Sequence, residues 1–564
     1  MGTALDYVCS SCVDKQNKED KVENYFISES DASAPQSLMD IKINTKNFVV
    51  RRKNNFYDDY EKIKFLGNGA FGSVFKVKKK NSGTRDIIRA LKEISKEALN
   101  DNLESEEELK NEIEVLKQLD HPNIMKIFEF YEDENYLYII NEFCGGGDVA
   151  GLNDKFGNFP EFLLKYIMYQ VFYAISFLHS NKVVHGDIKR ENIAYIYADE
   201  NKDKEELDIF FKSFFSDKEI QYELAEASGL ENLSDKALEI AKELTNFTIK
   251  ILDFGSAKMK KLINIKEKLT GVTGTAYYCS PEVIEEKYDF ECDEWSCGVM
   301  MYILLTGCPP FQGNTEEEIF SNILNNEADF DNPKLKNVTE NCKDLIKKLL
   351  VKDANKRIVA SEALKHKFFN EGINIGNLLK GKFKENETIL RGMIRRNMTE
   401  RKENSKFKEV VIAYIALNFS TKSVEKDARQ IFMEISGGDK HFLIKKDTFV
   451  NKMEHICKNL SKNEIEDLFD NIDDNKTGNI EYEELIRALS DNEKILNDKN
   501  LKEAFQFFDK DNSGKISWNE IAEVVYPEGK IPHNTIQEFL KEIGQKDENM
   551  QIDYYQFKKI LKSK

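Results

Sequence analysis

Residues 185–192 read H-G-D-I-K-R-E-N, and this stretch decides the fold of the longest part of the chain. It places Asp187, Lys189 and Asn192 at fixed offsets, ahead of a D-F-G triplet at residues 253–255. A carboxylate can accept a hydroxyl proton, a lysine can neutralise a phosphoryl group, and carboxylate and amide oxygens suit Mg²⁺. We therefore expect a phosphoryl-transfer site built around this stretch.

Further motifs flank this stretch in a fixed order. L-G-N-G-A-F-G-S-V at residues 66–74 is a glycine-rich segment whose backbone can lie close to phosphates without side-chain clashes. Lys92 ends A-L-K, and Glu112 in N-E-I-E-V-L is its expected partner on a helix. Glu282 ends G-T-A-Y-Y-C-S-P-E, and Arg357 in N-K-R-I is its candidate ion-pair partner. Each motif is weak alone, but their order makes the signal specific.

Residues 60–369 resemble a serine/threonine protein kinase domain. The resemblance implies a bilobal fold, ATP and Mg²⁺ as cofactors, and protein substrates with serine or threonine acceptors. It implies catalytic roles for Asp187 and Lys189 and magnesium-binding roles for Asn192 and Asp253. The implied ATP-binding residues are Leu66, Gly67, Gly69, Gly72, Val74, Ala90, Lys92, Glu112, Glu142 and Cys144.

The chain departs from the kinase pattern in three places. Gly186 stands where many kinases carry arginine, and the polar Asn141 precedes the expected hinge, at the back of the adenine pocket. The two expected magnesium ligands are 61 positions apart, which indicates an insertion at about residues 197–246. We expect a loop over 200–230 and an amphipathic helix over 232–244. A surface insertion without function and a functional element both remain open.

The C-terminal part repeats every 36 or 37 residues, with Asp-rich or degenerate loops near positions 436, 473, 509 and 545, as tandem EF-hands do. Two loops read D-D-N-K-T-G-N-I-E-Y-E-E (473–484) and D-K-D-N-S-G-K-I-S-W-N-E (509–520). Both supply oxygens at the spacing that Ca²⁺ needs, with glycine at position 6 and glutamate at position 12. The expected ligands are Asp473, Asn475, Thr477, Asn479 and Glu484 in one loop, and Asp509, Asp511, Ser513, Lys515 and Glu520 in the other.

The first and fourth loops are degenerate. The first lacks aspartate at positions 1, 3 and 5, and the fourth has Met550 in place of glycine and Gln556 at position 12. A neutral glutamine cannot supply a bidentate carboxylate. We expect both loops to keep the EF-hand fold without binding calcium, and the hands to pair first with second and third with fourth.

A kinase domain, a basic junction and four EF-hands together resemble the calcium-dependent protein kinases of plants and protists. The resemblance implies a multidomain α+β chain, with a bilobal kinase fold (60–369), an autoinhibitory junction (370–424) and an all-α calmodulin-like domain of four EF-hands (425–564). It implies that calcium makes the EF-hand domain engage the junction and release it from the kinase domain. The alternative is a calcium-responsive scaffold with a weakly active or inactive kinase fold.

The junction carries the residue types that this control requires. Its arginines and lysine suit an acidic substrate cleft, and its apolar residues suit an EF-hand groove. The cationic candidates are Arg391, Arg395, Arg396, Arg401 and Lys402. The apolar candidates are Leu390, Met393, Ile394, Phe407, Val410 and Val411. A solvated basic helix that acts as a spacer is the other interpretation.

Residues 1–59 form an expected flexible tail, in which Gly2, Cys9 and Cys12 are candidate acylation sites. Two acyl chains would attach an otherwise cytoplasmic protein to a membrane surface, whereas an ordinary flexible terminus would not. The net charge of -18 argues against nucleic acid as a partner. Of the nine cysteines only Cys9 and Cys12 stand in C-x-x-C spacing, and none has metal-type spacing with histidine, so we interpret them as reduced thiols. We find no apolar run of about 20 residues.

Overall fold

A computed structural model describes twelve segments: 45–52, 54–69, 72–80, 86–97, 112–198, 204–259, 276–381, 383–400, 405–436, 443–525, 533–542 and 551–562. All of them belong to one compact unit of the chain, Pro35–Lys564. The candidate acylation sites, Arg401 and Lys402 lie outside the described residues. Among the described helices, none is long and apolar enough to cross a membrane.

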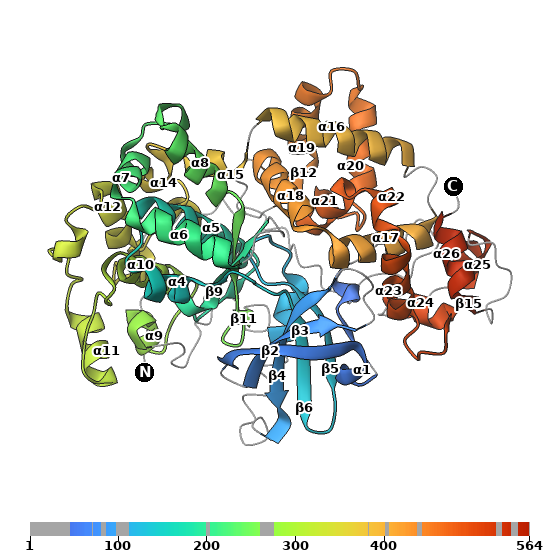
Figure 1. Ribbon diagram of the computed structural model, residues 1–564, viewed down its shortest axis with the longest axis horizontal. Helices are drawn as coiled ribbons and strands as arrows, with labels where there is room; N and C mark the ends of the chain where they lie inside the picture. Colours follow the sequence, from blue (N-terminus) through green and yellow to red (C-terminus); the bar gives the residue numbers. More distant parts are fainter. Residues whose placement is uncertain are drawn as a thin grey trace, which may run out of the picture. The chain divides into compact units, whose positions relative to one another are not determined.

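The first lobe is a six-stranded sheet in the order β1-β5-β6-β4-β3-β2 (Figure 1). All neighbouring strands are antiparallel except β1 and β5. Alternating side chains divide between its faces, so Leu91 and Ile140 join one cluster while Ile94 and Ile139 join the main core. Its elements are η3 (Thr45–Phe48), β1 (Val50–Arg51), α1 (Phe56–Asp59), β2 (Tyr60–Gly69), β3 (Gly72–Lys79), β4 (Ile88–Ser95), β5 (Ile127–Glu132) and β6 (Tyr136–Asn141). Residues 112–118 are helical.

The second lobe is mainly helical and is built around α5, whose side chains are almost all buried. Helix α10 is buried along almost its whole length as well. The elements up to α10 are β7 (Gly147–Asp148), α4 (Val149–Phe156), α5 (Glu161–Ser180), β8 (Val183–Val184), η4 (Arg190–Asn192), β9 (Ile193–Tyr197), β10 (Phe247–Ile251), β11 (Lys258–Met259), η6 (Ala276–Tyr278), α9 (Pro281–Ile284) and α10 (Glu291–Thr306). The rest are α11 (Glu316–Asn325), η7 (Pro333–Leu335), α12 (Glu340–Leu349), η8 (Ala354–Lys356), α13 (Ala360–Ala363), α14 (Lys367–Asn370) and α15 (Ile375–Leu379).

The insertion connects β9 to β10, which pair antiparallel from Ile193↔Ile251 to Tyr197↔Phe247. The prediction of a loop over 200–230 is wrong, because two amphipathic helices occupy most of it, followed by the expected third helix. They are α6 (Lys204–Ser216), α7 (Lys218–Glu226), η5 (Leu230–Asn232) and α8 (Asp235–Leu244). These helices bury apolar side chains in the main core, namely Leu207, Phe211, Phe214, Ile220 and Leu224. The free energy of this apolar burial offsets the entropy lost when the helices become ordered.

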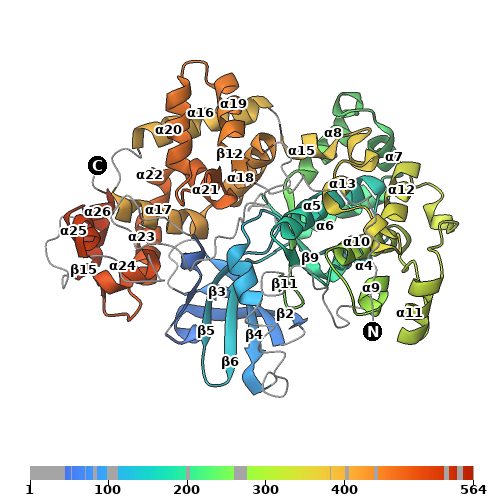
Figure 2. The same cartoon turned by 180° about the vertical axis from the view of Figure 1, so that it is seen from behind.

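The C-terminal part consists of helices and two short two-stranded sheets (Figure 2). The predicted pairing of the hands is confirmed, since β12 pairs with β13 and β14 with β15. Up to the second hand the elements are α16 (Phe383–Glu400), α17 (Lys406–Phe419), α18 (Lys422–Ile435), β12 (Ile444–Lys445), α19 (Lys446–Ile456), α20 (Lys462–Ile472), β13 (Asn479–Ile480) and α21 (Tyr482–Leu489). Then follow α22 (Asn492–Ile495), α23 (Asp498–Phe508), β14 (Lys515–Ile516), α24 (Trp518–Val525), α25 (His533–Glu542), β15 (Ile552–Asp553) and α26 (Tyr554–Lys562).

The apolar residues of the junction are covered by the EF-hands. Leu390, Met393 and Ile394 of α16 are buried in the same cluster as α18, α20 and α21 of the first two hands. Phe407, Val410 and Val411 of α17 are buried with α23, α24 and α26 of the last two hands. The two halves of the junction therefore lie in different hydrophobic clusters, and α17 also contacts α21 of the first pair.

Candidate active site and calcium sites

Three charged groups meet between the sheet and the helical lobe. Lys92 Nζ lies 2.7 Å from Glu112 Oε2 and 3.3 Å from Asp253 Oδ1. Burial alone would lower the pKa of Lys92, but the two carboxylates outweigh it and raise that pKa. Burial would likewise raise the pKa of Asp253, yet Lys92 and His185 hold it below its usual value. The structure thus brings the predicted Lys92, Glu112 and Asp253 together, and the contacts favour the charged forms of Lys92 and Asp253.

The catalytic-loop candidates form a second cluster. Asp187 Oδ2 lies 2.7 Å from Lys189 Nζ and accepts a hydrogen bond of 2.9 Å from Asn192 Nδ2. Asp187 Oδ1 is buried and has no hydrogen-bond partner among the described residues. Because the side-chain nitrogen of Asn192 is engaged, its side-chain oxygen Oδ1 is the atom left for a metal.

A backbone hydrogen bond and a ring contact join this loop to the D-F-G segment. The Leu252 N–H donates to the backbone carbonyl of Asn192 at 2.8 Å, and the centroids of the His185 and Phe254 rings lie 4.9 Å apart. Asp253 has a φ of 58°, a left-handed conformation that costs a non-glycine residue roughly 1–3 kcal/mol. Packing on both sides therefore holds the strained backbone of Asp253 and so places its carboxylate beside Lys92.

Gly186 also has a left-handed backbone, with a φ of 76°. Its N–H donates to Asp293 Oδ1 at 2.9 Å, and an added Cβ would lie 3.1 Å from the Ser256 carbonyl oxygen. Any side chain at this position would be strained, so glycine suits the conformation of the loop. The threonines of the following segment (270, 273 and 275) lie outside the described residues.

The expected nucleotide face follows from strand register. Val74 lies opposite Lys92, and Ala90 lies opposite Asn141, so their side chains share one face of the sheet. Gly72 permits the close approach of β3 to β4, since a Cβ there would lie 1.9 Å from the Glu93 carbonyl oxygen. Leu66, Gly67 and Gly69 belong to β2, which pairs with β3 beside this face.

The side chains of the two predicted hinge residues, Glu142 and Cys144, are engaged or buried within the protein. The Glu142 carboxylate lies 2.8 Å from Lys250 Nζ and 2.6 Å from Lys422 Nζ, so it is held by the second lobe and by α18. These lysines outweigh burial and hold the pKa of Glu142 well below its usual value. Burial raises the pKa of the Cys144 thiol to about 12, so Cys144 is not a reactive thiolate. At Glu142 the backbone is the part available to a nucleotide.

The second EF-hand loop is folded around its first and last acidic residues. Asp473 accepts hydrogen bonds from the Thr477 N–H at 3.0 Å and the Gly478 N–H at 2.9 Å. Glu484 reaches back to the Asp474 N–H at 2.8 Å and the Glu481 N–H at 2.9 Å. The predicted Asn475 is also within the loop and donates to Glu481 at 3.2 Å.

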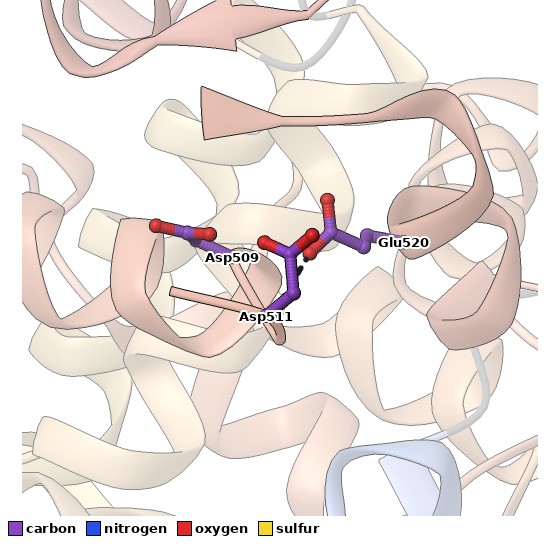
Figure 3. A group of neighbouring side chains, drawn as sticks. All are labelled: Asp509, Asp511 and Glu520. Carbon is purple, nitrogen blue, oxygen red and sulfur yellow. Dashed lines mark hydrogen bonds between the residues drawn. The ribbon is translucent and has the colours of Figure 1, made fainter. Parts of the chain in front are cut away.

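The third loop has the same geometry (Figure 3). Asp509 accepts from the Ser513 and Gly514 N–H groups, each at 2.9 Å. Ligand atoms of Asp509, Asp511 and Glu520 lie within 4.8 Å of one another, a spacing that a single cation can bridge. Asn479 and Lys515 occupy position 7, where a backbone carbonyl is the expected ligand. The degenerate loop residues 437–442 and 543–550 lie outside the described residues.

A group of residues that no sequence motif predicts attaches the EF-hands to the kinase lobes. Arg429 is buried and its guanidinium donates to the Thr245 carbonyl at 2.9 Å and to Thr248 Oγ1 at 2.6 Å. Glu483 pairs with Lys126. No local pattern marks these residues, because their partners lie far away in the sequence.

Comparisons with known proteins identify the parts of the chain. The family model of the protein kinase domain matches residues 60–204 and 236–369, and its gap lies inside the insertion. An EF-hand domain pair matches 498–562, and a single EF hand matches 465–490. These matches define the class: a protein kinase with EF-hands in the same chain.

Curated relatives match almost the whole chain. Calcium-dependent protein kinase 4 of Plasmodium berghei is 31% identical over 541 residues, covering 93% of this chain and 90% of the relative. Calcium-dependent protein kinase 4 of Plasmodium falciparum is 29% identical over 555 residues, covering 97% and 94%. Calcium-dependent protein kinase 3 of Plasmodium berghei is 31% identical over 529 residues, covering 93% and 84%. The chain belongs to the calcium-dependent protein kinase family.

Proposed function

We propose that this protein is a calcium-activated serine/threonine protein kinase, which transfers the γ-phosphoryl group of ATP to protein hydroxyls. The observation that carries the proposal is Asp187, whose Oδ2 is fixed by Lys189 and Asn192 while its Oδ1 has no partner among the described residues. Such a carboxylate can orient a substrate hydroxyl and accept its proton. No observation favours an inactive scaffold.

The other residues fit ATP and Mg²⁺. Lys92, held by Glu112, is placed to bind nucleotide phosphates, and Lys189 to stabilise charge on the transferred group. Asn192 and Asp253 offer the oxygen ligands that Mg²⁺ prefers. When bound, Mg²⁺ neutralises charge on the phosphate oxygens. The chain's own contribution is to position these groups before substrate arrives.

Control by calcium rests on the two intact loops and on the junction. Calcium at these loops stabilises the arrangement in which α16 and α17 are buried by the EF-hand pairs, and so keeps the junction off the substrate cleft. Arg391 and Arg396 donate to the Ile456 and Leu489 carbonyls, so these two cations are held by the EF-hands here. A phosphate on the activation segment would have no arginine partner at Gly186, so we expect control to lie in the junction and the two calcium loops.

Membrane attachment is a separate part of the proposal, supported by Gly2, Cys9 and Cys12 at the N-terminus. Labelling with a clickable myristate analogue in cells tests it, with Gly2→Ala as the control. Label on the wild type but not on Gly2→Ala is expected, and equal label on both would contradict myristoylation at Gly2.

The catalytic proposal is tested with Asp187→Asn in full-length protein. We expect peptide phosphorylation to fall by roughly 10²–10⁴-fold, the usual contribution of a general base, while Mg·ATP affinity changes little. Nucleotide affinity is measured by titration calorimetry on the same samples. Activity of the variant within a few fold of the wild type would contradict the role of Asp187.

A further inference from the structure

The C-terminal end of the insertion and the start of β10 accept a buried arginine from the first EF-hand. Helix α8 ends at Leu244, and the side chain of Arg429, on α18, lies beside this end. Its guanidinium donates to three acceptors, which we call the arginine seat: the Thr245 carbonyl at 2.9 Å, the Phe247 carbonyl at 3.2 Å and Thr248 Oγ1 at 2.6 Å. The last carbonyls of a helix carry partial negative charge, so a cation is favourable here.

The arginine seat suits a guanidinium rather than an ammonium group. A guanidinium carries five N–H donors in a planar fork, so it can reach several acceptors at once. Arg429 also donates to Gln170 Oε1 of α5 at 3.2 Å, so one side chain joins the insertion to the core of the helical lobe. A lysine in its place would keep the charge but offer a single nitrogen, and some of these acceptors would lose their donor.

A second cation of α18 contacts the insertion beside the arginine seat. Lys426 Nζ lies 2.7 Å from Asn246 Oδ1, which accepts its hydrogen bond. The Asn246 side chain is itself held, since its Nδ2 donates to Glu243 Oε2 at 3.1 Å and to the Tyr197 hydroxyl at 3.2 Å. Tyr197 lies at the start of the insertion and Glu243 near its end. The insertion itself therefore builds this contact.

Helix α18 is also attached to the second calcium loop. The Tyr482 hydroxyl donates to the Glu425 carbonyl of α18 at 2.9 Å, and the centroids of the Tyr482 and Phe432 rings lie 5.9 Å apart. Tyr482 lies two positions before Glu484, the predicted calcium ligand. A rearrangement of this loop when it binds or loses calcium therefore acts directly on α18, the helix that carries Arg429.

We propose that the end of the insertion is a calcium-dependent docking site for α18. Calcium at the second loop favours the position of α18 in which Arg429 and Lys426 contact the insertion. Docking in turn raises the affinity of this loop for calcium, because the coupling between two binding events is reciprocal. The inference rests on the proposed control by calcium, and it assigns a regulatory role to the insertion.

Hydrogen–deuterium exchange of the full-length protein tests this docking without requiring catalysis. Peptides that cover residues 239–250 are followed by mass spectrometry, from EGTA to saturating calcium. In the wild type we expect slower exchange in calcium, because the docked α18 keeps the end of α8 from opening to solvent. The readout is the calcium concentration at which half of this protection is reached.

Two variants weaken the docking to different degrees. Arg429→Lys keeps the charge without the fork, and it should raise the half-protection calcium concentration roughly 5- to 50-fold, within the usual range for coupled sites. Lys426→Met removes one donor and should raise it roughly 3- to 10-fold, the effect of one hydrogen bond. Lys446→Met is the matched control, because Lys446 pairs with Asp470 within the first two EF-hands, and it should leave this concentration unchanged.

Equal exchange of these peptides in calcium and in EGTA would overturn the inference. An unchanged half-protection concentration in Arg429→Lys would also overturn it, and Lys426→Met decides the matter if Arg429→Lys does not fold. Calcium-dependent protection in a protein whose peptide phosphorylation does not respond to calcium would support the docking site and contradict the proposed function.

Discussion

The first EF-hand pair (422–489) and the second pair (498–562) have the same plan but different surroundings. Each joins an intact loop to a degenerate one through a two-stranded sheet. The first pair belongs to the hydrophobic cluster that also contains α5 and α10 of the kinase. The second pair forms a separate cluster with α17 and Phe48. The same motif is thus joined to the catalytic domain in one case and mainly to the junction in the other.

Polar contacts follow the same division. The first pair contacts the hinge through Lys422 and Glu142. It contacts the kinase again through Glu483, which pairs with Lys126 and is the neighbour of Glu484, the predicted calcium ligand. The second pair contacts the sheet through Glu503, 3.0 Å from Lys79, on the helix before its calcium loop. We therefore expect calcium at the second loop to act on the catalytic domain more directly than calcium at the third.

The largest expected effect comes from removing the position-12 carboxylates. Glu484→Gln and Glu520→Gln should each lower calcium affinity at their own loop by roughly 10- to 100-fold, the size of a lost charge-assisted interaction. Calcium-stimulated activity should fall in both, and further in Glu484→Gln, because its neighbour Glu483 contacts the kinase. Calcium titrations of peptide phosphorylation measure this. Equal losses would remove the distinction between the pairs, and wild-type activation in both would refute control by these loops.

The next effect concerns how each pair is attached to the kinase. Arg429→Met should lower the free energy of unfolding by roughly 3 kcal/mol, because it leaves buried acceptors such as Thr248 Oγ1 and the Thr245 carbonyl without a donor. Glu503→Gln should cost less, about 1–2 kcal/mol, because the amide oxygen can still accept from Lys79 Nζ, which lies 3.0 Å from Glu503 and 3.8 Å from Glu129. Denaturant unfolding in saturating calcium measures both. A larger loss in Glu503→Gln would reverse the ranking of the two attachments.

Acid should weaken both attachments only at low pH. Burial would raise the pKa of Glu129, but Arg52 and Lys79 lower it to about 2. A depressed carboxyl pKa stabilises the fold above the unfolded-state pKa of about 4.5, and that stability, roughly 3 kcal/mol, is lost as pH falls from there toward 2. The pKa of Glu142, in the attachment of the first pair, is lowered in the same way by Lys250 and Lys422.

Unfolding measured against pH compares the wild type with Glu129→Gln. The wild type should lose part of its stability advantage over this variant below about pH 4.5 and keep it between pH 5.5 and 7.5. A change in the advantage within the neutral range would contradict the charge assignment at the second attachment.

The smallest effect is expected at a surface salt bridge within the first EF-hand pair. Lys446 Nζ lies 2.7 Å from Asp470 Oδ1, and both side chains are well exposed. Lys446→Ala should change the free energy of unfolding by less than about 0.5 kcal/mol and leave calcium activation unchanged. The same denaturant and activity measurements check this. A change as large as that of Arg429→Met would show that distance from the kinase does not set the ranking.

Much of the fold and the site follows from local sequence. The calcium loops, the α5 helix and the order of kinase motifs each carry their own pattern of residues. The helices of the insertion had such a pattern too, since Leu207, Phe211 and Phe214 recur at helical spacing and are buried. Its high charge led to the wrong prediction of a loop.

The attachment of the EF-hands has no local pattern. Lys422 and Glu142 are 280 positions apart, and Arg429 and Thr248 are 181 apart. Lysine and arginine on a helix are usually solvated, and only the tertiary packing buries them. The ion pair at the hinge therefore becomes visible only in the folded chain.

The central claim is that calcium at the EF-hands controls phosphoryl transfer at Asp187. The most direct measurement is phosphorylation of a serine/threonine peptide by the full-length protein in calcium and in EGTA, with Asp187→Asn as the blank. We expect strong activity in calcium, little in EGTA and none above background in Asp187→Asn. Equal wild-type activity in calcium and EGTA would contradict the claim.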